Sequence, residues 1–406
     1  MNSTLDRYAT SRATSARARE IIAGGQHLSG RALLSEQPPL YLERGKGCRV
    51  LDVDGNEYID YLLAYGAIVL GYADEEVDAA AFAQARQGQL LSLNHRLHVE
   101  FAECLLRWFP AAELAMFMKT GSEATTAALR IARRATGRRR VIRCGYHGWH
   151  DWCLPLEGWV PDGLDEQVLE FDANDPDGLT AILAAYPREV AAVIVAPEMV
   201  LPSRGEPLHR IAALTRAAGA VFVLDEVKTA FRIRPGSIQR RYDLTPDLTT
   251  VSKALGNGWP VAAVLGTRAV MEHATGMHCS ATYHGEVSAM AAAMRTLELI
   301  EERGVLDHVW TQGERLIEGF ERAAVRHGLP IEMFGEPLPP MPMLRVTGED
   351  AGLRDRITQT FFGEMMKLGV LLHPRHLWFM CAEHSAEDVR RTIDAADQAM
   401  ELASRT

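Results

Sequence analysis

Lysine is scarce in this chain: only five of its 43 basic residues are lysines, and the others are arginines. The five are Lys46, Lys119, Lys228, Lys253 and Lys367. Arginine supplies the same charge, but only lysine can lose its proton and form a Schiff base with a carbonyl compound. Lys253 lies between an apolar run and a glycine-rich turn, in VSKALGNGWP (251–260). This placement makes Lys253 a candidate nucleophile.

Other absences exclude several classes of protein. The formal net charge is −10 and no long Lys/Arg block reverses it, so nucleic acid is not expected as a partner. The six cysteines have no CxxC spacing, which is typical of reduced thiols and not of a disulfide framework or a metal site. No apolar run approaches the roughly 20 residues that cross a bilayer. Residues 1–22 lack an apolar signal-peptide core and are interpreted as an amphipathic surface helix, so a cytoplasmic protein is expected.

The central part of the chain has the pattern of an α/β domain. From about 75 to 300, short apolar runs alternate with helical patterns of ten or more residues. Buried strands between such helices indicate a mostly parallel sheet covered by helices. The expected strands include 115–119, 140–144, 191–196, 220–225, 248–252 and 261–266.

Both ends of the chain are expected to form a smaller α+β domain. Alternating residues around two turn signals predict a β-meander at 39–61. Strongly helical patterns and later strands follow from about residue 300. We therefore expect an N-terminal segment at 1–61 that joins the small domain, a large domain at 62–300 and a C-terminal small domain at 301–406.

A helix opens directly after one expected strand, at Thr120-Gly121-Ser122. Backbone N–H groups at a helix N-terminus, with a glycine and a hydroxyl beside them, make a phosphate site. A serine that only caps the helix would give the same pattern. The chain has neither a GxxxxGK[ST] nor a GxGxxG pattern, so nothing indicates a P-loop or a dinucleotide site.

Three further candidates follow later apolar runs. Asp225-Glu226 ends one run, and acids at that place can hold a protonated ring nitrogen, bind a metal or cap a helix. No cluster with ligand spacing supports a metal. Tyr146 could stack on a planar ligand or pack in the core, and Lys253 could be an ordinary surface residue. A lysine, an acid, an anion site and an aromatic face at the ends of strands are together what pyridoxal 5′-phosphate (PLP) requires.

The chain resembles the class III, fold type I PLP-dependent aminotransferases, in particular the branch that contains glutamate-1-semialdehyde 2,1-aminomutase. The resemblance covers nearly the whole chain. It rests on GG-x5-R at 24–31, DVDGNEYIDY at 52–61, TGSEAT at 120–125, YHGWHD at 146–151, DEVKTAFR at 225–232, PDLTTVSKALGNGWP at 246–260 and ATYHGE at 281–286. The implied fold has a large domain with a seven-stranded, mostly parallel sheet.

The resemblance also implies roles for individual residues. Lys253 would form the Schiff base with PLP and then act as the general base. Asp225 would pair with the pyridine nitrogen. Val227 and Tyr146 would cover the two faces of the ring.

The remaining implied roles concern the phosphate and the substrate. Gly121 and Ser122 would hold the phosphate, which Thr282 would reach from the other subunit, so a homodimer with shared sites is implied. Arg31 would bind a substrate carboxylate, a task that suits a bidentate guanidinium, although it could also be an exposed loop residue. The substrates would be a small amino donor and a carbonyl acceptor, with pyridoxamine phosphate as the second form of the cofactor.

Three departures from the family pattern bear on the reaction. Ala196 stands where the family has glutamate, and Glu198 follows two residues later. Residues 283–287 replace a common Gly-Asn-Pro, and the segment 149–169 is shorter than the gating loop of the aminomutase. These departures favour a biosynthetic aminotransferase with a ping-pong mechanism. The alternatives are the aminomutase and a related racemase or epimerase.

Overall fold

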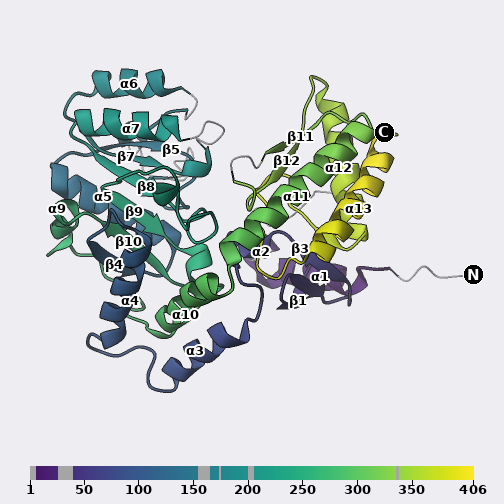
Figure 1. Cartoon of the computed structure of the whole chain (residues 1–406), viewed down its shortest axis with the longest axis horizontal. Coiled ribbons are helices and arrows are strands. Elements are labelled where there is room, and N and C mark those ends of the chain that lie inside the picture. Colours follow the sequence, from purple (N-terminus) through teal and green to yellow (C-terminus); the bar gives the residue numbers. More distant parts are fainter. Residues whose placement is uncertain (1–5, 26–39, 154–164, 173–174, 200–204, 335–337) are drawn as a thin grey trace, which may run out of the picture. The chain divides into compact units, whose positions relative to one another are not determined.

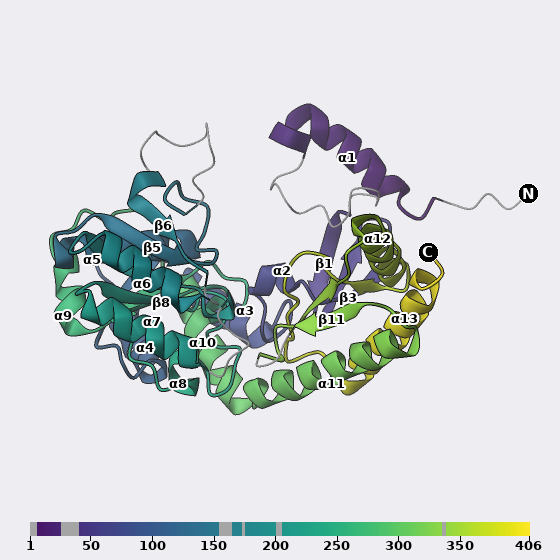
Figure 2. The ribbon, with the colours of Figure 1, turned by 90° about the horizontal axis from the view of Figure 1, so that it is seen from above.

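The computed structural model describes residues 6–25, 40–153, 165–172, 175–199, 205–334 and 338–406 (Figure 1, Figure 2). The chain divides into two compact units. We call Glu75–Asp307 the seven-strand unit, and Met1–Asp74 with His308–Thr406 the four-strand unit. None of the helices in the described ranges has both the length and the apolar character needed to span a membrane.

The seven-strand unit is built on one sheet with a single reversed strand (Figure 1). In spatial order its strands are β4 (Leu114–Met118), β10 (Ala262–Gly266), β9 (Leu248–Val251), β8 (Val221–Asp225), β7 (Val190–Val195), β5 (Arg140–Cys144) and β6 (Val168–Glu170). β10 is antiparallel to both of its neighbours, and β9, β8, β7, β5 and β6 are mutually parallel. The predicted mostly parallel sheet is confirmed. Only the three-residue β6 was not expected, because no apolar run of strand length marks it.

Helices cover this sheet and fix the ends of its strands. The helices of the unit are α3 (Glu75–Ala85), α4 (Arg96–Trp108), α5 (Gly121–Thr136), α6 (Pro176–Ala185), α7 (Glu206–Ala217), α8 (Ile238–Arg241), α9 (Arg268–Met271) and α10 (Ser288–Glu302). α5 packs its small and aliphatic side chains on β7, β9 and β10, and α7 packs on β8. β7 and β8 are buried along their whole length, which explains why they are continuous apolar runs.

The four-strand unit contains the meander that the sequence predicts. β1 (Leu42–Lys46), β2 (Arg49–Asp52) and β3 (Glu57–Asp60) are antiparallel, and β13 (Val370–Leu371) joins β3 in parallel. A separate pair consists of β11 (Ile331–Phe334) and β12 (Met343–Val346). The other elements are α1 (Ala9–Ile21), α2 (Leu63–Gly66), most of α11 (Val305–Arg326), α12 (Ala351–Lys367) and α13 (Ala386–Ala403).

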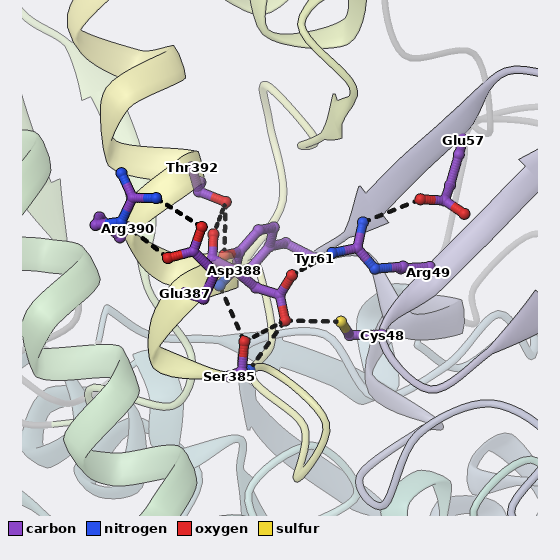
Figure 3. A network of polar contacts seen from close by, with 9 residues as sticks. All are labelled: Cys48, Arg49, Glu57, Tyr61, Ser385, Glu387, Asp388, Arg390 and Thr392. Atoms are coloured by element: carbon purple, nitrogen blue, oxygen red, sulfur yellow. Dashed lines mark hydrogen bonds and ion pairs between the residues drawn. The ribbon is translucent and has the colours of Figure 1, made fainter.

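The start of α13 is tied to the meander by one buried carboxylate (Figure 3). Asp388 completes a capping box with Ser385, whose hydroxyl donates to it over 2.6 Å. The same carboxylate pairs with Arg49 of β2 and accepts a contact from the thiol of Cys48 at 3.7 Å. Because Cys48 is buried beside a carboxylate, its pKa is raised to about 12, so the thiol is unreactive. The network is therefore a structural link between segments more than 300 residues apart in sequence.

A left-handed turn follows β3. Leu63, Ala64 and Tyr65 have φ values of 45°, 50° and 59°, and Gly66 has a φ of 87°. Non-glycine residues in this conformation each cost about 1–2 kcal/mol, so three in succession store strain. A Cβ on Gly66 would lie 2.7 Å from a ring carbon of Phe379, which explains the glycine.

Candidate active site

The candidate residues lie where strands of the large sheet end. β4 runs antiparallel to β10, as β9 does, so β4 points in the same direction as the parallel strands. Gly121 and Ser122 open α5 directly after β4, and Tyr146 follows β5. Asp225 ends β8 and Lys253 follows β9. Five residues from four strands are thus brought to one edge of the sheet, the edge at which ligands bind in open α/β sheets.

Asp225 is held in a fixed orientation. Its side chain is 4% exposed. One carboxylate oxygen lies 2.7 Å from Nδ1 of His147, and the other accepts from the hydroxyl of Thr250 at 2.7 Å and from the amide of Val227 at 3.2 Å. His147 is itself anchored, because its Nε2 lies 3.1 Å from the carbonyl of Cys144. A carboxylate fixed in this way suits a group that must face a single ring nitrogen.

Lys253 combines an unusual backbone with an amine that deprotonates easily. Its φ of 47° lies in the left-handed region, where non-glycine residues are uncommon and often functional. Burial, and then the positive charge of Lys228, lower the pKa of Lys253 to about 7, against the attraction of Glu198 and Asp225. Much of the amine is therefore unprotonated near neutral pH, which is the nucleophilic form.

The first turn of α5 is open to an anion. The N–H groups of Gly121 and Ser122 have no acceptor within the helix because they precede its first hydrogen-bonded turn. A Cβ on Gly121 would come within 2.9 Å of Val227, so a larger residue would displace that side chain. Gly148, with a φ of 116°, lets the loop after β5 approach so closely that a Cβ there would lie 2.3 Å from the hydroxyl of Ser122.

The flanks of this edge are lined by an aromatic and an aliphatic side chain. Tyr146 is 50% exposed and does not pack in the core. Its ring lies 5.6 Å from the ammonium of Lys228. Val227 is half-buried between Asp225 and the start of α5.

Two of the predicted site residues, Thr282 and Arg31, stay predictions. Thr282 lies in the exposed turn before α10, and no hydrogen bond of the described residues joins it to Lys253, Asp225 or Ser122. Arg31 lies outside the described residues. No group of three His, Cys, Asp or Glu side chains that could hold a metal ion occurs within the described ranges.

These residues fit PLP. The amine of Lys253 can receive an aldehyde, the fixed Asp225 can pair with a ring nitrogen, and the first turn of α5 can bind a phosphate. The absence of a side chain at Gly121 lets Val227 lie directly against the start of this helix, so the candidate ring contact and the candidate phosphate site are neighbours.

A family model for class-III aminotransferases matches residues 32–332. The chain belongs to the class-III aminotransferases. This aminotransferase is 34% identical over 371 residues to 3-aminobutyryl-CoA aminotransferase of Cloacimonas acidaminovorans, covering 89% of each chain. It is 33% identical to glutamate-1-semialdehyde 2,1-aminomutase of Archaeoglobus fulgidus, covering 96% of this chain and 99% of that protein.

The comparison of structures agrees with the family. The PLP internal aldimine form of the FumI protein of Sphingopyxis sp. MTA144 superposes with a TM-score of 0.91 and 30% identity, covering 98% of the aminotransferase and 97% of that chain. The fold is therefore that of the fold type I transaminases, and the cofactor is PLP. The protein is a PLP-dependent aminotransferase of class III.

The interpretation of the sequence missed several residues that surround the aminotransferase site. His147 and Thr250 orient Asp225. Glu198 and Lys228 form a buried ion pair beside the site. A signal existed for Lys228, since it is one of only five lysines, and for Glu198, since it departs from the family pattern. No spacing in the sequence links Asp225 to its partners, because Thr250 and His147 lie 25 and 78 residues away from it.

Proposed function

We propose that this aminotransferase moves an amino group from an amino-acid donor to a carbonyl acceptor in two half-reactions at one site, with Lys253 as the reacting amine. The observation that carries the proposal is that Lys253, with its pKa lowered to about 7, and the fixed carboxylate of Asp225 end adjacent parallel strands. When bound, PLP supplies an aldehyde that takes up the amino group and an electron-withdrawing ring, and it alternates with pyridoxamine phosphate.

The side chains around the site divide the remaining work. The amides of Gly121 and Ser122 would hold the phosphate. Asp225, kept in place by His147 and Thr250, would keep the ring nitrogen protonated. Val227 and Tyr146 would bound the two faces of the ring.

Lys253 would carry the proton. In its neutral form the amine can accept a proton from the carbon that bears the substrate amino group, and it can return that proton to another atom of the same reacting system. A pKa near 7 suits this exchange, because a base works best when its pKa lies near the working pH.

We further propose that one substrate carries its amine at the β-position of an acyl group. The support is the similarity to 3-aminobutyryl-CoA aminotransferase over 89% of both chains. Arg31 is proposed to bind a carboxylate of the donor or of the acceptor. Such chemistry would suit a biosynthetic enzyme.

A second candidate function is the aminomutase, an isomerase. It is favoured by the similarity to glutamate-1-semialdehyde 2,1-aminomutase, which covers 96% of this chain. The short segment 149–169 argues for two separate substrates instead, since an isomerase must retain its intermediate.

We also propose a homodimer with shared sites in the cytoplasm. The exposed turn with Thr282 and Tyr283, the latter 64% exposed, would meet the partner subunit, where Thr282 would reach the phosphate. The proposed location is supported by the six free cysteines.

A panel of amino donors and keto acids tests the function. The purified PLP enzyme is mixed with α- and β-amino donors, and absorbance follows the change between the two cofactor forms. We expect β-amino donors to convert the cofactor and to release a keto product, which an added acceptor reverses. The isomerase is supported instead if glutamate 1-semialdehyde alone yields 5-aminolevulinate. If no donor changes the absorbance, the proposed amino transfer is wrong.

A further inference from the structure

A second lysine lies beside the reacting one. Lys228 follows β8, and its ammonium is 2.6 Å from a carboxylate oxygen of Glu198, which follows β7. Their side chains are 13% and 4% exposed. Burying two charges is costly even when they compensate each other, so a buried ion pair is weak evidence of a contribution to stability.

The Lys228–Glu198 pair has a further contact with an aromatic ring, but one of its buried oxygens lacks a hydrogen bond among the described residues. The ammonium of Lys228 lies 5.6 Å from the centre of the Tyr146 ring, a cation–π distance. The Oε2 atom of Glu198 is buried and has no hydrogen-bond partner in the part of the chain that the structure describes. Buried polar groups are normally hydrogen-bonded, so this oxygen calls for an explanation, and a role in the site is one. Lys228 and Lys253 follow the ends of adjacent parallel strands, β8 and β9, in which Asp225 is paired with Thr250, so the two lysines lie three residues beyond paired positions.

We propose that Glu198 and Lys228 act together on the reacting amine: the ammonium of Lys228 keeps Lys253 unprotonated, and Glu198 keeps Lys228 charged and in place. Lys228 and Glu198 are then positioning residues that act through Lys253. The inference rests on the proposed function in one respect, namely that Lys253 is the reacting amine.

The charges around Lys253 agree with this arrangement. After burial, the charge of Lys228 is the largest influence that lowers the pKa of Lys253, and Arg232 acts in the same direction. Glu198 and Asp225 oppose them. For Lys228, burial also favours the neutral form, but the attraction and hydrogen bond of Glu198 outweigh it and raise the pKa. The pKa values of the two buried lysines are therefore shifted in opposite directions, because Lys228 is paired directly with a glutamate.

Amine labelling of the full-length chain freed of cofactor tests the inference. Acetic anhydride reacts with neutral amines, and peptide mass spectrometry gives the labelled fraction of each lysine as a function of pH. Lys367, whose side chain is 61% exposed, is the internal reference. We expect the labelling of Lys253 to rise through about pH 7 in the wild type.

Substitutions of Lys228 separate its charge from its volume. In Lys228→Gln the labelling midpoint of Lys253 should move up by about one pH unit or more, because a like charge has been removed. Lys228→Arg keeps the charge and should leave the midpoint close to that of the wild type. Lys119→Gln is the matched control, because Lys119 also pairs with a glutamate, Glu286, and has the same 13% exposure. It should leave the midpoint unchanged.

Glu198→Gln gives an independent measurement. Without its acid partner, Lys228 should become labelled at a lower pH than in the wild type. The inference is overturned if Lys228→Gln leaves the midpoint of Lys253 unchanged, or if Glu198→Gln leaves that of Lys228 unchanged. If Lys228→Gln does not fold, as judged by circular dichroism, Lys228→Met and Glu198→Gln carry the same test. Because labelling requires no turnover, a failure of the proposed amino transfer would be seen separately.

Discussion

At the scale of single residues, the site is organised around two fixed points, an amine and a carboxylate. Lys253 has a left-handed backbone, and Asp225 accepts hydrogen bonds on both oxygens. Lys253 cannot be replaced by arginine, its nearest relative in charge, because arginine cannot form a Schiff base. Substitutions of these residues are therefore expected to remove activity without unfolding the protein.

Lys253→Ala should remove amino transfer while the protein still folds and takes up some PLP through the phosphate and ring contacts. The loss should be at least the roughly 10²–10⁴-fold that a positioned general base contributes. Stopped-flow absorbance with a good donor measures it, and a melting curve checks the fold. Full activity in this variant would remove Lys253 from the mechanism.

His147→Ala should lower kcat about 10- to 100-fold, because Asp225 loses a partner and can turn away from the ring nitrogen. Thr126→Val is the comparison, since Thr126 bonds the neighbouring His150 and not Asp225. We expect Thr126→Val to affect kcat much less. Equal losses in the two variants would mean that the whole loop, and not Asp225, is disturbed.

The residues that could be found from the sequence are those whose chemistry is rare and whose place is marked by a strand end. Lys253, Asp225, Gly121 and Ser122 were predicted in this way. The partners of Asp225 were not, because hydrogen bonds across a sheet depend on strand order. The order β9-β8-β7-β5, which sets Thr250 and His147 on either side of Asp225, cannot be read from one sequence.

At the scale of elements, most strands could be predicted from the sequence, but one turn could not. Six strands and the meander were predicted, because apolar runs and turn residues mark them. The left-handed turn of α2 was not, since Leu-Ala-Tyr-Gly has no turn signal before its glycine. The turn brings Gly66 close to Phe379, a residue more than 300 positions away in the sequence, and local patterns do not report such a contact.

Asp388→Ala should lower the free energy of unfolding by about 1–3 kcal/mol, because the variant loses a cap and leaves Arg49 without its buried partner. Chemical denaturation measures the change. Asp394→Ala is the control on the same helix, since its ion pair with Arg390 is 56% exposed on the aspartate side and should contribute little. If both substitutions lower the free energy of unfolding by a similar amount, Asp388 does not stabilise the protein in the way described.

Ala64→Gly should stabilise the protein by roughly 0.5–1 kcal/mol. Glycine adopts the left-handed conformation without strain, and the strain energy removed exceeds the entropy that a glycine loses on folding. Ala64 is exposed, so no core contact is lost. Gly66→Ala should act in the opposite direction, owing to the contact with Phe379. The melting temperatures of the two variants should therefore lie on opposite sides of the wild-type value.

At the scale of the whole molecule, the buried amine makes the stability of the cofactor-free chain depend on pH. Lys253 has a pKa of about 7 when folded and its ordinary value of 10.5 when unfolded. Between these values the unfolded chain binds more protons, so this group makes stability rise with pH. Lys253→Met should raise the free energy of unfolding relative to the wild type, and this increase should become smaller from pH 7 to pH 10, as measured by urea denaturation. A gain that stays constant over this range would contradict the lowered pKa.

The reversed strand β10 has a consequence for which molecules can occupy the site. It inserts one strand between β4, which leads to the helix that would receive the phosphate, and β9, which leads to the amine. Neighbouring strands are about 4.8 Å apart, so the two ends are separated by roughly 10 Å of sheet. β10 thus keeps the amine and the helix terminus apart at the same edge of the sheet. A bare aldehyde could reach the amine but would leave the helix terminus empty, whereas a ring that carries both an aldehyde and a phosphate arm could use both.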